Sequence, residues 1–126
     1  MAKKVILNKV KIDYELEGEE LKKFLAQGNP EFLDYRITYM SLLKTPKDPQ
    51  IGASFEETAE AMPIWKKFKD LPLTEGVIIL EDAEHKFLTE CVTENAKYVQ
   101  RSYELFEMGT SLKDAEDYEL KEAKTG

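Results

Sequence analysis

The sequence is poor in the residues that most often bind metals or act as nucleophiles. It contains one cysteine, Cys91, and one histidine, His85, among 126 residues. A single cysteine excludes an internal disulfide and fits a reducing compartment. A single histidine among scattered carboxylates lacks the further convergent ligands of a zinc site. We therefore expect neither a disulfide-stapled secreted domain nor a bound metal.

Long apolar runs and glycine-rich loops are missing as well. No stretch approaches the ~20 apolar residues that span a bilayer. Asn8 and Lys9 break the apolar run of residues 5–7, so a signal peptide is not expected. The six glycines form no phosphate cradle. These absences predict a cytoplasmic protein that does not enter a membrane and needs no cofactor.

Charge, by contrast, is plentiful and unevenly placed. Charged residues make up 34% of the chain and hydrophobic residues 42%, which is typical of a globular domain. Residues 1–74 contain 12 acids and 12 bases, whereas residues 75–126 contain 13 acids and 6 bases, which gives a net charge of −7. An acidic half repels duplex DNA, although the same excess also serves solubility.

Local patterns predict an α+β domain that is mostly helical, with about five helices and one short two-stranded sheet. Residues 5–16 contain an alternation of apolar and polar side chains, as a half-buried strand does. Residues 77–80 are four apolar residues in a row, as in a strand buried on both faces. We expect these two segments to pair, with the helices covering the sheet.

Capping residues and helical spacing predict helices at residues 19–26, 30–44, 55–70, 82–95 and 96–108. Asn29 and Pro30 are expected to start the second helix. Ser54 and Glu57 form a capping box for the third helix. Pro63 is expected to kink or restart that helix, because a proline removes a backbone hydrogen bond.

The last predicted helix sets the expected domain boundary. Gly109 is a natural helix stop, and the residues after it are mostly polar. We therefore assign residues 1–109 to one compact α+β domain and residues 110–126 to an acidic C-terminal tail.

Helical spacing also predicts which faces are buried. On the second helix the stripe is Leu33, Ile37 and Met40, widened by Phe32, Tyr39 and Leu43. On the third it begins with Phe55, Ala59 and Met62, and on the last it is Val99, Tyr103 and Phe106.

The histidine supports one hypothesis of catalysis. Glu81 and His85 are four residues apart and could share a helix face, so a metal-dependent enzyme could use Glu81, Glu84 and His85. Asp82 is better explained as a helix cap, because the helix dipole favours acids in the first turn. Cys91 lies roughly 240° around the helix from His85, so the two make a poor catalytic pair.

Lysines beside an aromatic residue support a second hypothesis. Lys66, Lys67 and Lys69 flank Trp65, a combination that can bind single-stranded nucleic acid by charge and stacking. The N-terminal lysines at positions 3, 4, 9 and 11 would enlarge this basic surface if they lie nearby. The alternative is a solvated helix face beside a core-facing tryptophan.

Tyrosines on helices whose other faces already supply a core, together with a tryptophan and the acidic tail, support protein binding, because tyrosine and tryptophan are enriched at protein interfaces. Alternatively, the tyrosine rings complete the core with their hydroxyls at its rim. The residues predicted to bind a protein are Tyr35, Tyr39, Trp65, Tyr98, Tyr103, Asp114, Glu116, Asp117 and Glu119.

Three segments carry a resemblance. They are Ile-Asp-Tyr-Glu-Leu-Glu-Gly at 12–18, the capped central helix, and Ile-Leu-Glu-Asp-Ala-Glu at 79–84 before a final helical pair. Together they resemble small proteins encoded by tailed bacteriophages and prophages. The resemblance implies a bacterial host's cytoplasm and an accessory protein that assembles with, or inhibits, another macromolecule.

The leading hypothesis is therefore a non-enzymatic, phage-type protein that binds a phage structural protein or a host enzyme. Self-association is left open. Association with nucleic acid is the alternative, and a metal-dependent enzyme is the third hypothesis.

Overall fold

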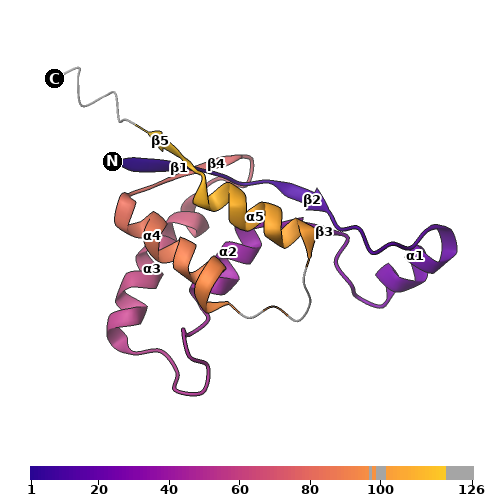
Figure 1. Ribbon diagram of the computed structural model, residues 1–126, viewed down its shortest axis with the longest axis horizontal. Helices are drawn as coiled ribbons and strands as arrows, with labels where there is room; N and C mark the ends of the chain where they lie inside the picture. Colours follow the sequence, from indigo (N-terminus) through magenta and orange to yellow (C-terminus); the bar gives the residue numbers. More distant parts are fainter. Residues whose placement is uncertain (97, 99–101, 119–126) are drawn as a thin grey trace.

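The computed structural model describes residues 1–96, 98 and 102–118 (Figure 1). Its helices are α1 (Gly18–Ala26), α2 (Tyr35–Leu43), α3 (Phe55–Asp70), α4 (Asp82–Glu90) and α5 (Tyr103–Lys113), and a π-helical segment, η1 (Cys91–Asn95), continues α4. The strands are β1 (Ala2–Ile6), β2 (Lys9–Lys11), β3 (Phe32–Asp34), β4 (Val77–Leu80) and β5 (Glu116–Tyr118). The predicted α+β class is confirmed, but the described residues form more strands than the two that were expected.

The strands form two antiparallel sheets. One has the order β4-β1-β5, and the other is the pair β2-β3. The predicted pairing of the N-terminal strand with residues 77–80 is confirmed, since β1 pairs with β4. The single two-stranded sheet is wrong. The alternation that continues to residue 16 is not strand beyond Lys11, because its partner β3 is only three residues long.

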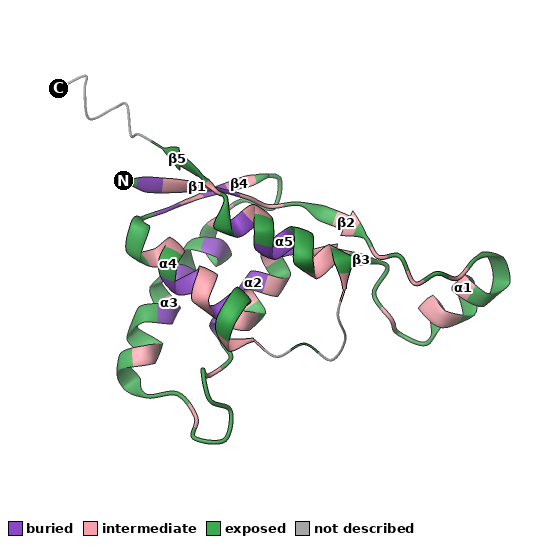
Figure 2. Ribbon diagram, in the orientation of Figure 1, coloured by how far each residue is buried: buried purple, intermediate pink, exposed green. Residues whose placement is uncertain are grey.

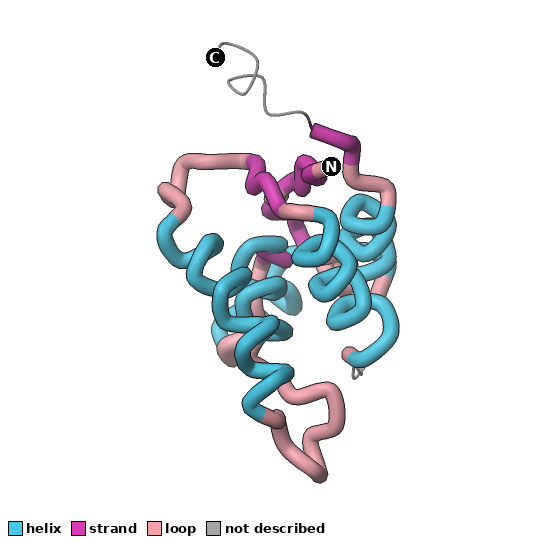
Figure 3. Tube along the Cα trace, turned by 90° about the vertical axis from the view of Figure 1, so that its left-hand side faces the viewer, coloured by secondary structure: helices cyan, strands magenta, loops and turns pink. Residues whose placement is uncertain are grey.

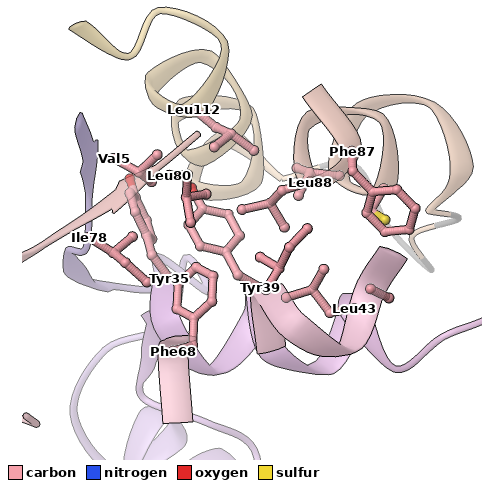
Figure 4. Packing of buried hydrophobic residues seen from close by; sticks show 14 of the residues in the cluster. Val5, Tyr35, Tyr39, Leu43, Phe68, Ile78, Leu80, Phe87, Leu88 and Leu112 are labelled. Atoms are coloured by element: carbon pink, nitrogen blue, oxygen red, sulfur yellow. The ribbon is translucent and has the colours of Figure 1, made fainter. Parts of the chain in front are cut away.

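The core lies between the larger sheet and the helices, which lie together on one side of it (Figure 3). The register pairs Val5 with Ile78 and Lys3 with Leu80, so Val5, Ile78 and Leu80 share the face toward the helices. That face meets side chains of α2, α3, α4 and α5 (Figure 4). The largest fully buried side chains are Tyr39, Phe68, Ile64, Leu80, Leu88, Met108, Leu112 and Val5.

Helix α2 begins five residues later than predicted. Residues 32–34 pair with β2 instead, and Asp34 caps the helix by accepting a hydrogen bond from the Ile37 backbone N–H at 3.2 Å. The later start comes with a different buried face. Tyr35, Tyr39 and Leu43 are buried, whereas Ile37 is 65% exposed. The predicted stripe is therefore wrong for Ile37, whereas its members Tyr39 and Leu43 are buried and Leu33 and Met40 pack partly buried against the core.

Helix α3 begins as predicted. The Glu57 backbone N–H donates to Ser54 Oγ at 3.0 Å, so the Ser54 cap is confirmed. The helix runs through Pro63 without a restart. Both Pro63 and Ala59 are exposed, so water can reach the Ala59 carbonyl that the proline leaves without a donor. Its buried residues are Ala61, Ile64 and Phe68. Phe55 is 85% exposed, so the predicted N-terminal part of the stripe is wrong.

The C-terminal part of the described chain belongs to the fold. Helix α5 continues through Gly109 to Lys113, because Met108 and Leu112 on either side of the glycine are both buried. Strand β5 then pairs with β1. Residues 110–118, assigned to a tail from the sequence, thus complete the last helix and the sheet. Residues 119–126 and Val99 lie outside the described residues.

An arm extends from this body. It consists of β2, α1 and β3 with their connecting loops, and α1 lies at its tip (Figure 1). Figure 2 shows that buried residues gather in the body and are not found on α1. Within the described chain, no helix has the length and apolar character needed to cross a membrane.

Candidate protein-binding groove

An apolar groove of about 620 Å³ lies between η1 and α5. The α5 side chains that face it recur three to four residues apart, which places them on one face of the helix. The opposite wall comes from η1 and the residue that ends it. The groove is lined by Val92, Thr93, Ala96, Tyr98, Ser102, Leu105, Phe106, Gly109, Thr110 and Lys113.

The shape of the groove depends on the ends of the two helical segments. Helix η1 ends at Ala96, whose backbone N–H donates to the Cys91 carbonyl at 3.0 Å before the chain becomes extended. Helix α5 starts at Ser102, whose Oγ accepts from the Leu105 backbone N–H at 3.3 Å. Local hydrogen bonds thus set where each of the two segments ends at the groove.

Gly109 forms the floor of the groove. A Cβ at this position would lie 3.8 Å from Thr93 Cγ2 and 4.0 Å from Val92 Cγ1, which are ordinary van der Waals distances. The packing of the chain therefore leaves room for a side chain at position 109. Gly109 is itself buried, and α5 lies close enough to η1 here that a single methyl group would contact both η1 side chains.

Aromatic residues form the rim. Tyr103 is 68% exposed and Phe106 is 65% exposed, and their ring centroids are 5.9 Å apart. Tyr98 is partly exposed, and its hydroxyl donates to the Val92 carbonyl at 2.9 Å. Burial of this hydroxyl raises the pKa of Tyr98. Two large rings in water beside an apolar hollow are typical of an interaction surface.

Two of the predicted protein-binding residues lie at the groove, and two others are buried in the core. Tyr98 and Tyr103 lie at the groove or its rim. Tyr35 and Tyr39 are 3% and 0% exposed, and burial raises the pKa of both phenols. The prediction that these two rings face a partner is wrong, because α2 turns them toward the core.

The predicted acidic residues lie elsewhere. Asp114 follows α5, and Glu116 and Asp117 are exposed on the edge strand β5. Asp117 also pairs with Lys3 at 2.5 Å across the sheet. Glu119 lies outside the described residues. The charged residue that does line the groove is Lys113, which was not predicted.

Sequence reasoning also missed Phe106 and Gly109 as site residues. It placed Tyr103 and Phe106 on the buried stripe of the last helix, which is wrong, and it made Gly109 a helix stop. A signal was present in the apolar residues Met108 and Leu112, which are four apart across the glycine. That spacing continues a helical stripe, and continuing it turns Phe106 outward.

Trp65 and its lysines form a separate surface on α3. The ammonium groups of Lys44 and Lys69 lie 4.8 and 5.2 Å from the indole centroid. Lys66 pairs with Asp70 at 3.0 Å, and Lys67 pairs with Glu84 at 2.6 Å.

The N-terminal lysines also have partners nearby. Besides the pair of Lys3 with Asp117, the Lys9 ammonium lies 5.3 Å from the Phe32 ring centroid on the arm. Several lysines of the predicted nucleic-acid surface are therefore engaged within the fold.

The groups of the proposed metal-dependent enzyme make structural contacts. His85 Nε2 lies 2.7 Å from the Leu112 carbonyl, which joins α4 to α5. Glu84 accepts from the Glu81 backbone N–H at 2.8 Å as part of the helix start. The N-cap is Glu81 and not Asp82, and Asp82 pairs with the N-terminal ammonium at 2.8 Å. Within residues 1–96, 98 and 102–118, no three His, Cys, Asp or Glu side chains are grouped to hold a metal.

Cys91 is buried on the same side of η1 as the core. Burial raises the pKa of its thiol to about 11. The thiol is therefore protonated at neutral pH, whereas the thiolate is the nucleophilic form.

No family model, curated protein or solved structure matches this chain. The case for a function therefore depends on the geometry of the groove.

Proposed function

We propose that this domain is a non-enzymatic accessory protein that binds another protein by taking an apolar helical segment of it into the groove between η1 and α5. The observation that carries the proposal is the apolar lining of the groove beside the exposed rings of Tyr103 and Phe106. Glycine in a helix interior is less favourable than alanine by ~1 kcal/mol. Since a Cβ would fit at position 109, the packing of the chain does not require a glycine.

The lining indicates the chemistry of the ligand. Its walls are aliphatic and aromatic, and the polar groups are the hydroxyls of Thr93, Ser102 and Thr110 together with Lys113 at the C-terminal end of α5. Such a lining suits a helix that inserts apolar side chains at i, i+3 or i+4, and i+7. The acidic excess of residues 75–126 would speed the approach of a basic partner.

The biological setting remains part of the proposal. The resemblance to phage-encoded proteins supports a role as an assembly or virion factor, or as an inhibitor of a host enzyme, in the bacterial cytoplasm. In each case the domain would act by occupying a surface of its partner.

The experiment is a selection of helical peptides from a displayed library against the folded domain. We expect the selected peptides to carry apolar residues at helical spacing. They should bind the wild type and lose binding to Gly109→Met, which fills the groove, and to Phe106→Asp, which charges its rim. The matched control is Phe55→Asp, because Phe55 is equally apolar and 85% exposed on α3 away from the groove.

Circular dichroism and thermal melting show whether each variant is folded. Peptides that bind Gly109→Met and Phe106→Asp as tightly as the wild type would overturn the proposal. So would a selection that yields only peptides sensitive to Phe55→Asp.

A further inference from the structure

Helix α1 on the arm is amphipathic, but its apolar face is only partly covered by the rest of the chain. Helix α1 has an apolar stripe, Leu21, Phe24 and Leu25, whose side chains are half-buried, and none of its nine residues is fully buried. Its contacts are local. The rings of Tyr14 and Phe24 meet at 4.7 Å, and Asn29 Nδ2 donates to the Phe24 carbonyl at 2.8 Å. Among the described residues, no other helix or strand packs extensively against it.

Such a helix is weakly supported by itself. Isolated helices shorter than ~12–15 residues are marginal in water, and most helical stability comes from packing an amphipathic face. The arm is closed at its base by the three-residue pairing of β2 with β3, and its Asp13 backbone N–H donates to Glu104 Oε1 of the body at 3.2 Å. A surface that covers the stripe of α1 would stabilise the whole arm.

We propose that the surface is the groove between η1 and α5 of a second copy of this chain, and that two copies exchange their α1 helices reciprocally. This inference depends on the proposed function, since it names the occupant of the same groove. The stripe of α1 has the i, i+3, i+4 spacing with which a helix enters an apolar groove. The chain thus carries both halves of one helix-in-groove contact.

Charge supports a second copy and fixes the direction of α1. Helix α1 has Glu19 and Glu20 in its first turn and Lys23 in its last. Helix α5 has the same polarity, with Glu104 in its first turn and Lys113 in its last. An α1 that lies antiparallel to α5 therefore places its first-turn acids beside Lys113, which lines the groove. The helix dipoles also favour this arrangement.

The position of the arm allows the exchange to be mutual. The hydrogen bond from Asp13 to Glu104 shows that the arm leaves the body beside the first turn of α5, where the groove also begins at Ser102 (Figure 1). Two copies related by a two-fold axis can then each place α1 in the groove of the other. Such a contact closes on itself and gives a dimer and not a filament.

The test is sedimentation equilibrium of the full chain over a wide range of concentration. We expect a monomer–dimer equilibrium. Phe24→Asp and Gly109→Met should each raise the dimer dissociation constant about 30-fold, the usual effect of losing an interface hot spot. Phe55→Asp should dimerise like the wild type.

A mixture of the two disabled variants is the decisive measurement. Phe24→Asp retains a groove and Gly109→Met retains an α1, so an equimolar mixture can form one intact contact and should dimerise more tightly than either variant alone. The charge pair gives an independent check that does not alter the core. Glu20→Lys and Lys113→Glu should each weaken the dimer about two- to fivefold, and the double variant should recover.

The outcomes separate the two proposals. A chain that stays monomeric, or a dimer that Gly109→Met leaves unchanged, overturns the exchange of α1. So does a mixture that dimerises no better than its components. If the selected peptides still require the groove in that case, the proposed function stands without the second copy.

Discussion

Helices α2 and α5 each present a pair of aromatic residues, and the two pairs lie in opposite environments. Tyr35 and Tyr39 of α2 are 3% and 0% exposed, whereas Tyr103 and Phe106 of α5 are 68% and 65% exposed. The difference does not come from the residues, which are similar in size and polarity. It comes from which face of each helix packs against the core. Aromatic side chains therefore serve the core in one helix and remain available to a partner in the other.

The largest expected difference between the two pairs is in stability. Tyr39 is fully buried, with its ring 6.0 Å from Phe68 and 6.2 Å from Tyr35 (Figure 4). Truncating a large buried side chain to alanine costs ~3–5 kcal/mol. Tyr39→Ala should therefore reduce the free energy of unfolding by that amount in urea titrations, and Tyr103→Ala should leave it within ~0.5 kcal/mol. Equal losses would contradict the comparison.

Much of the framework was predictable, because its signals are local. Ser54 caps α3 through a contact three residues away, and residues 77–80 are apolar enough to indicate a buried strand by themselves. The start of α2 was not predictable in this way. It depends on the pairing of residues 32–34 with β2, a segment more than twenty positions earlier.

The same limit applies to the candidate site. The position of α5 depends on contacts of Met108 and Leu112 with the core, so Gly109 read in isolation indicates a helix stop. Tyr98 and Tyr103 were predicted to bind a protein from residue type alone. Type cannot distinguish them from Tyr35 and Tyr39, because burial is decided by tertiary packing.

Alkaline pH should lower the stability of the protein through the buried Tyr39 of α2. Burial, followed by the neighbouring Tyr35, raises the pKa of Tyr39 in the folded protein. Above the ordinary tyrosine pKa of about 10, the unfolded chain loses the Tyr39 proton while the folded chain keeps it. The free energy of unfolding should therefore fall as pH rises through this value.

The matched variant is Tyr39→Phe, which removes the titrating group and one long hydrogen bond to the Met108 carbonyl. Its stability should decline less steeply with alkaline pH than that of the wild type. If the free energy of unfolding, measured by urea titration at each pH, fell equally steeply for both proteins, Tyr39 would ionise as readily in the folded as in the unfolded chain.

Replacing Gly109 should change the free energy of unfolding by less, and it should stabilise the protein. Gly109→Ala adds a Cβ at ordinary contact distances and replaces a poor helix former with the best one. We expect the free energy of unfolding to increase by ~0.5–1 kcal/mol. Peptide binding should change less than in Gly109→Met, because a methyl group fills little of the groove. A loss of stability in thermal melts would show that position 109 needs its glycine for packing.

The smallest effect on stability should come from the rim. Phe106→Ser removes a ring that is 65% exposed, and surface substitutions of this kind change the free energy of unfolding by less than ~0.5 kcal/mol. Binding, in contrast, should weaken strongly, because the energy of an interface is concentrated in exposed aromatic residues of this kind. We expect affinity for groove-binding peptides, measured by calorimetry, to fall at least ~30-fold. A variant that keeps its affinity but unfolds readily would place Phe106 with Tyr39 as a residue of the core.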